Sequence, residues 1–334
     1  MHGLVRLDKK HLWHPFTQQQ EWVNEVREHP LVIARGKGVY LYDTQGRKYL
    51  DGVSSLWCNL LGHNHPALNR AVQRQLNRVA HTTFLGLTHE PGIRLAKELT
   101  RLAPKNLTRV FYSDNGSTSV EVALKMAYQY HRQKNPHSRR TEFVALQNSY
   151  HGDTIGSVSV GGIGLFHRLF RPLLFKTHFA MSPHCQQCPF NRRKTGGLYS
   201  YIYGNENPKP GDYRAQTGCR WECLSSVENF FKKRAAKIAA AVVEPVVQGA
   251  SGILVMPPGW LKGFERLCRK YDILWIADEV AVGFCRTGPV FACEHEKAAP
   301  DFLCLSKGIS GGYLPLAATL TGEKIYRAFL GRYE

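Results

Sequence analysis

The sequence lacks the segments that mark membrane-spanning or exported proteins. Its 334 residues include no apolar run of about 18 residues, the length that a membrane-spanning helix needs. The first 22 residues have no apolar core and contain Asp8 and Glu21, so they resemble neither a signal peptide nor a transit peptide. We therefore expect a cytoplasmic protein.

Acidic residues are also scarce, since 26 Asp and Glu stand against 44 Lys and Arg, for a formal net charge of +18. Such an excess can indicate nucleic-acid binding. The basic residues are scattered, however, with only short groups at residues 192–194 and 232–234, so we expect no nucleic-acid partner. A hydrophobic share of 43% and a charged share of 21% indicate a globular protein, with two domains or one large domain and an accessory lobe.

The nine cysteines include two close pairs, Cys185 with Cys188 and Cys219 with Cys223. Such pairs have the spacing of a structural zinc or iron–sulfur site. They lie near the two ends of residues 183–223, a segment rich in Pro, Gly, Asn and basic residues that predicts a long surface excursion. Reduced thiols in a surface insert explain the pairs more simply, so we assign no metal.

From residue 109 the sequence alternates short apolar runs with segments of helical periodicity, which is typical of an α/β fold with a mostly parallel sheet. The predicted strands are residues 110–112, 143–146, 238–243, 273–277, 302–305 and 317–320. The predicted helices are residues 117–131, 227–233 and 259–271, with further helical spacing at 68–79 and 95–102. A β-hairpin is predicted from residues 38–43 and 48–51.

Residues suited to cofactor chemistry follow four of these strands. Gly116 and Ser117 begin a helix, whose first N–H groups either bind an anion such as phosphate or are simply capped. Asp278 ends a buried strand and needs a cationic partner, which is either a salt bridge or a cofactor's ring nitrogen. Lys307 offers an amine at a strand end, although most lysines are solvated surface groups. Tyr150 offers an aromatic face at the same edge of the sheet.

Together these features match pyridoxal 5′-phosphate better than any one of them does alone. The helix start would hold its phosphate, the aromatic side chain would cover its ring, and the carboxylate would keep its ring nitrogen protonated. The lysine would bind its aldehyde as a Schiff base. We therefore predict a pyridoxal-phosphate-dependent enzyme.

Seven segments resemble the class III pyridoxal-phosphate aminotransferases, which have fold type I. They are HLWHPFTQ (11–18), DGVSSLWCNLLGHNHP (51–66), YSDNGSTSVEVALKMA (112–127), YHGDTIG (150–156), EPVVQGASG (244–252), ADEVAVGFCRTG (277–288) and LSKGISGGYLPLAATLT (305–321). The WHPFT and SSLW stretches narrow the resemblance to the diaminopelargonate-forming aminotransferases of biotin synthesis. The implied fold is a large domain with a mostly parallel, seven-stranded sheet and a partial small domain.

The resemblance assigns a role to each candidate cofactor-binding residue. Lys307 would be the catalytic Schiff-base lysine and would carry the proton during transamination. Asp278 would pair with the ring nitrogen. Gly116 and Ser117 would bind the phosphate, and Tyr150 would stack on the ring and contact the substrate.

The resemblance also places Phe16, Trp57 and Arg286 at the substrate, beside Tyr150. The implied reaction converts 7-keto-8-aminopelargonate to 7,8-diaminopelargonate in ping-pong order through pyridoxamine phosphate. S-adenosylmethionine is the usual amino donor, but Phe16 and Leu56 replace a Tyr and a Trp of many members, so lysine stays open. The alternatives are another class III ω-aminotransferase, acting on ornithine, 4-aminobutyrate or a diamine, and an inactive truncated fragment.

The resemblance further predicts the domains and the assembly. Residues 1–60 would belong to the small domain and line the active site, and residues 61–325 would form the large cofactor-binding domain. Residues 326–334 would begin the C-terminal part of the small domain, which continues in family members, so we expect a C-terminally truncated chain. Sites of this fold type are usually built between two subunits, which implies a homodimer with shared active sites.

Overall fold

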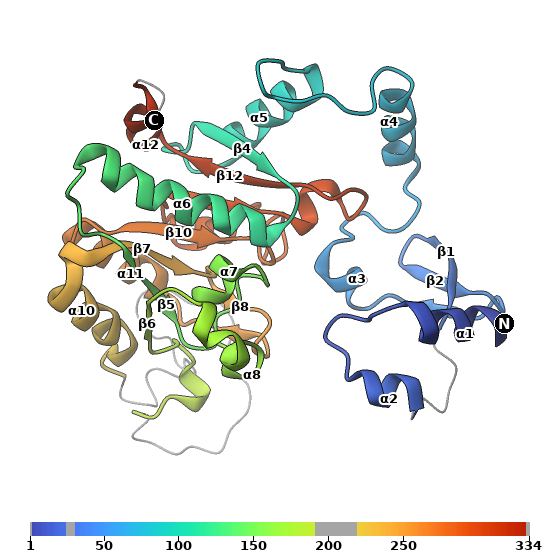
Figure 1. Cartoon of the computed structure of the whole chain (residues 1–334), viewed down its shortest axis with the longest axis horizontal. Helices are drawn as coiled ribbons and strands as arrows, with labels where there is room; N and C mark the ends of the chain where they lie inside the picture. Colours follow the sequence, from blue (N-terminus) through green and yellow to red (C-terminus); the bar gives the residue numbers. More distant parts are fainter. Residues whose placement is uncertain (1, 25–30, 191–218, 332–334) are drawn as a thin grey trace. The chain divides into compact units, whose positions relative to one another are not determined.

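The computed structural model describes residues 2–24, 31–190 and 219–331 (Figure 1). The chain divides into two compact units. The first unit comprises Met1–Thr83 with Gly311–Tyr313, and the second comprises Phe84–Ser310 with Leu314–Glu334. Every helix within the described ranges is too short or too polar to cross a membrane.

The first unit contains a three-stranded antiparallel sheet and four helices. The strands are β1 (Ile33–Lys37), β2 (Tyr40–Asp43) and β3 (Lys48–Leu50), and the helices are α1 (His2–His11), α2 (Gln19–Asn24), α3 (Ser54–Trp57) and α4 (Pro66–Leu76). The pairing of β2 with β3 confirms the predicted hairpin. Asp43 fixes its turn, because its carboxylate accepts hydrogen bonds from Gln45 N and Arg47 N, both across 2.9 Å.

This unit includes α4, which begins with a proline at its first position and packs beside a later segment of the chain. The hydroxyl of Tyr313 accepts a hydrogen bond from His65 N, just before the helix. A side chain added at Gly311 would contact Leu68 at 3.5 Å. These contacts join α4 and residues 311–313 to the first unit.

The second unit is an α/β structure. Its strands are β4 (Arg109–Ser113), β5 (Glu142–Leu146), β6 (Thr177–Ala180), β7 (Ile238–Val243), β8 (Val247–Gln248), β9 (Leu254–Val255), β10 (Leu274–Asp278), β11 (Phe302–Leu305) and β12 (Ala317–Thr321). Its α-helices are α5 (Glu90–Leu102), α6 (Gly116–Lys134), α7 (Ile155–Ser159), α8 (Gly164–His167), α10 (Glu222–Arg234), α11 (Trp260–Lys270) and α12 (Glu323–Tyr326).

Seven of these strands form one sheet in the order β4-β12-β11-β10-β7-β5-β6. Only β12 runs antiparallel to its neighbours within this sheet. Strands β7 and β10 are buried along their whole length, as expected for parallel strands covered on both faces. This architecture confirms the predicted mostly parallel α/β fold.

Helices cover both faces of this sheet, with α6 on one side and α10 and α11 on the other (Figure 1). The alternation along β10 shows how the strands serve both layers. Trp275 packs with Trp260 and Phe264 of α11, whereas Ile276 packs with Val120 and other residues of α6. The sheet is therefore fixed between two apolar layers, and its strand ends are held in place.

All six predicted strands of this region are present, within one or two residues of their predicted ends. The prediction missed the two-residue strands β8 and β9, and it missed β6, which is a four-residue strand at the edge of the sheet. Its sequence gives no apolar run, because His178 in its middle is polar and pairs with Glu142 of β5, with 2.8 Å between His178 Nε2 and Glu142 Oε2.

Candidate functional site

The predicted phosphate-binding residues lie where β4 ends and α6 begins. Asn115 caps the helix, because its side chain accepts a hydrogen bond from Thr118 N and its own N–H donates to Thr118 Oγ1, each across 3.1 Å. Gly116 and Ser117 therefore form the first turn without serving as the cap. N–H groups of a first turn have no acceptor within the helix, so they are available to an anion.

Two glycines allow other segments to approach this helix start closely. A Cβ atom at Gly116 would lie 2.6 Å from Val280 Cγ1. Gly152 has a φ of +120°, and a Cβ atom there would lie 2.0 Å from Ser117 Oγ. Ser117 Oγ accepts a hydrogen bond from Asp153 N across 3.1 Å. The loop after β5 and the loop after β10 thus converge on the start of α6.

Strands β11 and β12 tie the same helix end to the sheet. The carbonyl oxygen of Ser119 accepts hydrogen bonds from Thr319 Oγ1 across 2.7 Å and from Cys304 Sγ across 3.5 Å. All three residues are buried. The first turn of α6 therefore has a fixed position relative to the ends of β10 and β11.

Asp278 ends β10 and lies against His151 from the loop after β5. The distance between His151 Nδ1 and Asp278 Oδ2 is 2.7 Å, and Asp278 Oδ1 accepts a hydrogen bond from Val280 N across 3.0 Å. An ionised carboxylate can only accept, so Nδ1 carries the hydrogen. The other ring nitrogen, His151 Nε2, is buried and has no hydrogen-bond partner among the described residues. The pair keeps a carboxylate oriented at the strand end.

Tyr150 is held beside this pair by a second buried carboxyl group. Glu244 accepts hydrogen bonds from Tyr150 N across 3.0 Å and from Gly249 N across 2.8 Å. Burial, with a smaller contribution from the nearby Asp278, raises the pKa of Glu244 from 4.5 to about 7. The Tyr150 hydroxyl donates to Asp153 Oδ2 across 2.6 Å, and burial with this contact raises the pKa of Tyr150.

Lys307 lies just beyond the end of β11 in the same unit. Cys304 of β11 pairs with Asp278 of β10, so Lys307 follows the strand position opposite Asp278 by three residues. The backbone of Lys307 is left-handed, with a φ of +45°, where it begins the short 3₁₀ turn Lys307–Ser310. Non-glycine residues adopt this conformation only when the surroundings demand it, often at functional sites.

The predicted substrate residues are less closely grouped. Arg286 is exposed in the loop after β10 of the second unit. Phe16 and Trp57 belong to the first unit, and the Phe16 side chain is largely exposed. The structure thus groups Gly116, Ser117, Tyr150, Asp278 and Lys307 at the strand ends of one unit.

Sequence reasoning assigned no role to His151 or Glu244. Glu244 lies 94 positions after Tyr150, and Asp278 lies 127 positions after His151, so spacing in the sequence could not reveal these contacts. The available signals were a histidine directly after Tyr150 and a carboxyl residue directly after the apolar run of β7.

The chemistry of these groups fits pyridoxal 5′-phosphate. A helix start is suited to the phosphate, a fixed buried carboxylate to the protonated ring nitrogen, and a strand-end lysine to the aldehyde. A metal has no comparable site, because the described ranges contain no group of three His, Cys, Asp or Glu side chains able to hold one. These ranges include Cys185, Cys188, Cys219 and Cys223.

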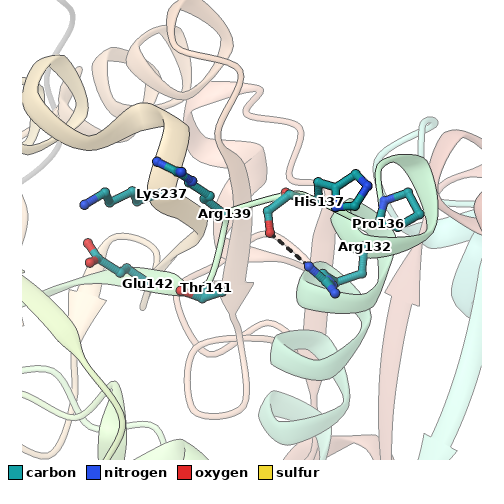
Figure 2. Close-up of a pocket in the computed structure, with 8 residues that line it drawn as sticks. Arg132, Pro136, His137, Arg139, Thr141, Glu142 and Lys237 are labelled. Carbon is teal, nitrogen blue, oxygen red and sulfur yellow. Dashed lines mark hydrogen bonds between the residues drawn. The ribbon is translucent and has the colours of Figure 1, made fainter.

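A basic pocket of about 680 Å³ lies elsewhere in this unit, near the amino ends of β5 and β7 (Figure 2). Its lining includes Arg132, Arg139, Lys237 and Glu142. Arg132 donates to the carbonyl oxygen of Ser138, as the dashed line in Figure 2 shows. None of the predicted site residues lines this pocket. It lies at the amino ends of the strands, whereas Asp278 lies at the carboxyl end of β10.

Comparisons with known proteins identify the family of the chain. The family described as aminotransferase class-III matches residues 23–332. The adenosylmethionine-8-amino-7-oxononanoate aminotransferase of Nitratidesulfovibrio vulgaris is 52% identical over 331 residues, which are 99% of this chain and 56% of that protein. The crystal structure of the Methanocaldococcus jannaschii enzyme of the same name has a TM-score of 0.85 and 40% identity, covering 99% of this chain and 68% of that one.

A PLP-bound amine transaminase from an uncultivated Pseudomonas species is also similar. It has a TM-score of 0.82 and 37% identity, and the match covers 95% of this chain and 66% of that chain. The chain thus spans little more than half the length of the N. vulgaris relative and about two thirds of the two solved structures.

Proposed function

The chain belongs to the class III aminotransferase family, and from that membership we propose that it binds pyridoxal 5′-phosphate and transfers amino groups. The observation that carries the proposal is the buried pair of Asp278 and His151, 2.7 Å apart, beside the start of α6 in the unit that contains Lys307. A buried carboxylate held this way favours a cation in front of it.

When bound, pyridoxal phosphate stabilises the negative charge that develops as a proton leaves the carbon bearing the amino group. The residues of the chain would hold it and move the proton. Gly116 and Ser117 would bind the phosphate, and Asp278 would keep the ring nitrogen protonated. Tyr150 would cover the ring. Lys307 would bind the aldehyde through Nζ and, once displaced by the amino donor, would carry the proton on the same atom.

We propose 7-keto-8-aminopelargonate as the amino acceptor, with 7,8-diaminopelargonate as the product. The names of the N. vulgaris and M. jannaschii relatives support this assignment, and they favour S-adenosylmethionine as the donor, with lysine as the second candidate. Phe16, Trp57 and Arg286 would contact the substrates together with Tyr150. A class III ω-aminotransferase of other specificity is the alternative that the assay must separate.

We further propose that the protein is a cytoplasmic homodimer. Large apolar side chains of the second unit are well exposed, among them Leu85 at 89% and Leu169 at 82%. Apolar side chains at this degree of exposure suit a protein interface. Light scattering after size exclusion tests the assembly, and a monomeric mass across the micromolar range would contradict it.

The activity is tested by incubating the purified chain and pyridoxal phosphate with 7-keto-8-aminopelargonate and either S-adenosylmethionine or lysine. We expect 7,8-diaminopelargonate with at least one donor. Turnover only with 4-aminobutyrate or ornithine would overturn the substrate assignment. Lys307→Ala should abolish the absorbance band of the bound cofactor at about 420 nm. Lys105→Ala, which removes an exposed lysine, should retain the band, and a band that survives in Lys307→Ala would show that another lysine holds the cofactor.

A further inference from the structure

The short helix α3 in the first unit is left-handed. Its residues Ser54, Ser55, Leu56 and Trp57 have φ values of 50°, 46°, 66° and 66°. The turn is closed by hydrogen bonds from Cys58 N to Ser54 O across 3.0 Å and from Trp57 N to Val53 O across 2.8 Å. Each non-glycine residue in this conformation is disfavoured, so four in succession require external support.

Asp51 supplies much of that support. Its Oδ1 accepts a hydrogen bond from Ser55 N across 2.9 Å, and its Oδ2 accepts one from Ser55 Oγ across 2.8 Å. Its backbone oxygen also accepts from Ser54 N across 3.1 Å. The Asp51 side chain is only 5% exposed, so water competes little for these bonds.

His63 holds the Asp51 carboxylate in turn. The distance between His63 Nε2 and Asp51 Oδ2 is 2.9 Å, and Asn59 Nδ2 lies 2.8 Å from His63 Nδ1. An amide nitrogen can only donate, so Nδ1 accepts and Nε2 carries the hydrogen that points at Asp51. The network therefore selects a single tautomer of His63.

The position of His63 is fixed by the strands of the first unit. Its backbone pairs with that of Gly38, from His63 N to Gly38 O across 2.7 Å and from Gly38 N to His63 O across 3.0 Å. A Cβ atom at Gly36 would lie 2.7 Å from His63 Cβ, so the strand packs directly on the imidazole side chain. A continuous set of contacts thus runs from β1 through His63 and Asp51 to the left-handed turn.

We infer that Asp51 and His63 are positioning residues that hold α3 left-handed and so set the conformation in which Trp57 meets the substrate. The part of this inference that concerns the substrate rests on the proposed function, in which Trp57 lines the pocket. A right-handed turn with the same sequence would point Leu56 and Trp57 in different directions.

A pair of substitutions tests the handedness and the support together. Asp51→Asn keeps the shape but removes the charge, and we expect the amides of residues 54–59 to exchange with deuterium roughly tenfold faster. Adding Ser54→Gly should restore most of the protection, because glycine adopts positive φ without strain and the Ser54 hydroxyl makes no hydrogen bond within the described residues. If the glycine instead accelerates exchange further, the turn is not left-handed and the inference fails.

The matched control is Asp43→Asn in the β2–β3 turn of the same unit, where the aspartate side chain is 3% exposed. It should leave the exchange of residues 54–59 unchanged. Equal acceleration by both variants would mean that Asp51 acts only through the general stability of the unit, which would overturn its specific role.

The functional readout is whether the substitution changes KM or kcat. In Asp51→Asn we expect the KM for 7-keto-8-aminopelargonate to rise roughly tenfold while kcat stays within about twofold and the 420 nm band is unchanged. A fall in kcat at constant KM would contradict a positioning role toward this substrate. Failure of the proposed function appears separately, as absence of the cofactor band or of turnover in the unsubstituted chain, while the exchange experiment still decides the role of Asp51.

Discussion

His151 Nδ1 donates a hydrogen bond to Asp278 Oδ2 across 2.7 Å, although the two residues are 127 positions apart in the chain. The His151 side chain is fully buried and that of Asp278 is 4% exposed. The contact joins the loop after β5 to the end of β10, which are not adjacent strands of the sheet. It therefore stabilises the fold and orients the carboxylate at the same time.

His151→Ala should lower the free energy of unfolding by about 3 kcal/mol, because Asp278 Oδ2 loses the hydrogen bond from His151 and a cavity remains. Urea denaturation followed by circular dichroism measures this change. His137→Ala, at an exposed histidine, is the matched control and should cost less than about 0.5 kcal/mol. Equal stability of the two variants would mean that the pair contributes nothing to folding.

The buried carboxyl of Glu244 predicts a pH dependence. Its pKa is about 7 in the folded chain against an ordinary value of 4.5, so between these values the folded chain holds a proton that the unfolded chain has released. The free energy of unfolding therefore falls as pH rises through this window. This pKa shift corresponds to a loss of about 3 kcal/mol in the free energy of unfolding by pH 8. Glu279, with a pKa also of about 7, adds a fall of the same sign.

Glu244→Gln should therefore reduce, but not abolish, the loss of stability between about pH 5 and about pH 8. Chemical denaturation at the two pH values measures the difference for each variant. Glu98→Gln makes the same change at an exposed position of α5 and should keep the wild-type difference. A Glu244→Gln chain with the full wild-type difference would show that this carboxyl is already ionised at pH 5.

Gly152→Ala should weaken cofactor binding by at least tenfold. Its Cβ atom would lie 2.0 Å from Ser117 Oγ, and its φ of +120° is one that alanine adopts at a cost of about 1–3 kcal/mol. The loop or the helix start must then move. Titration with pyridoxal phosphate, followed by absorbance, measures the affinity. Gly164→Ala, which has open space around its Cβ position, should bind as the unsubstituted chain does.

Removal of metal should leave the chain intact. Since the described residues hold no group of three potential ligands, treatment with a chelator should shift the melting temperature by less than about 2 °C. Elemental analysis of the untreated protein checks the same point. Zinc at one equivalent, together with a larger shift of the melting temperature on chelation, would indicate that the cysteine pairs 185/188 and 219/223 bind the metal.

Much of the second unit could be predicted from the sequence because its strands are buried on both faces. Ile238–Val243 and Phe302–Leu305 are uninterrupted apolar runs, and the structure gives them the predicted bounds. Thr177–Ala180 lies at the sheet edge, where an apolar run is not required, and the prediction missed it. Burial on both faces thus makes a strand easy to recognise in the sequence, although β4 was also predicted at the other sheet edge despite its partial exposure.

The site could be predicted only in part, for a related reason. Local patterns located the start of α6 and the strand-end residues Asp278 and Lys307, because each follows an apolar run. They could not reveal that His151 contacts Asp278 or that Glu244 accepts a hydrogen bond from Tyr150 N, since these contacts depend on strand order. The left-handed conformation of α3 was also invisible, because Ser54 and Trp57 have no intrinsic preference for it.

The hydrogen bonds from Thr319 and Cys304 to the carbonyl of Ser119 have a thermodynamic consequence for ligand capture. They immobilise the first turn of α6 in the folded chain, so an arriving phosphate group meets donors whose conformational entropy was already lost during folding. Binding there should then show a small ordering penalty and a fast association step, and loosening either bond would appear first as a less favourable binding entropy.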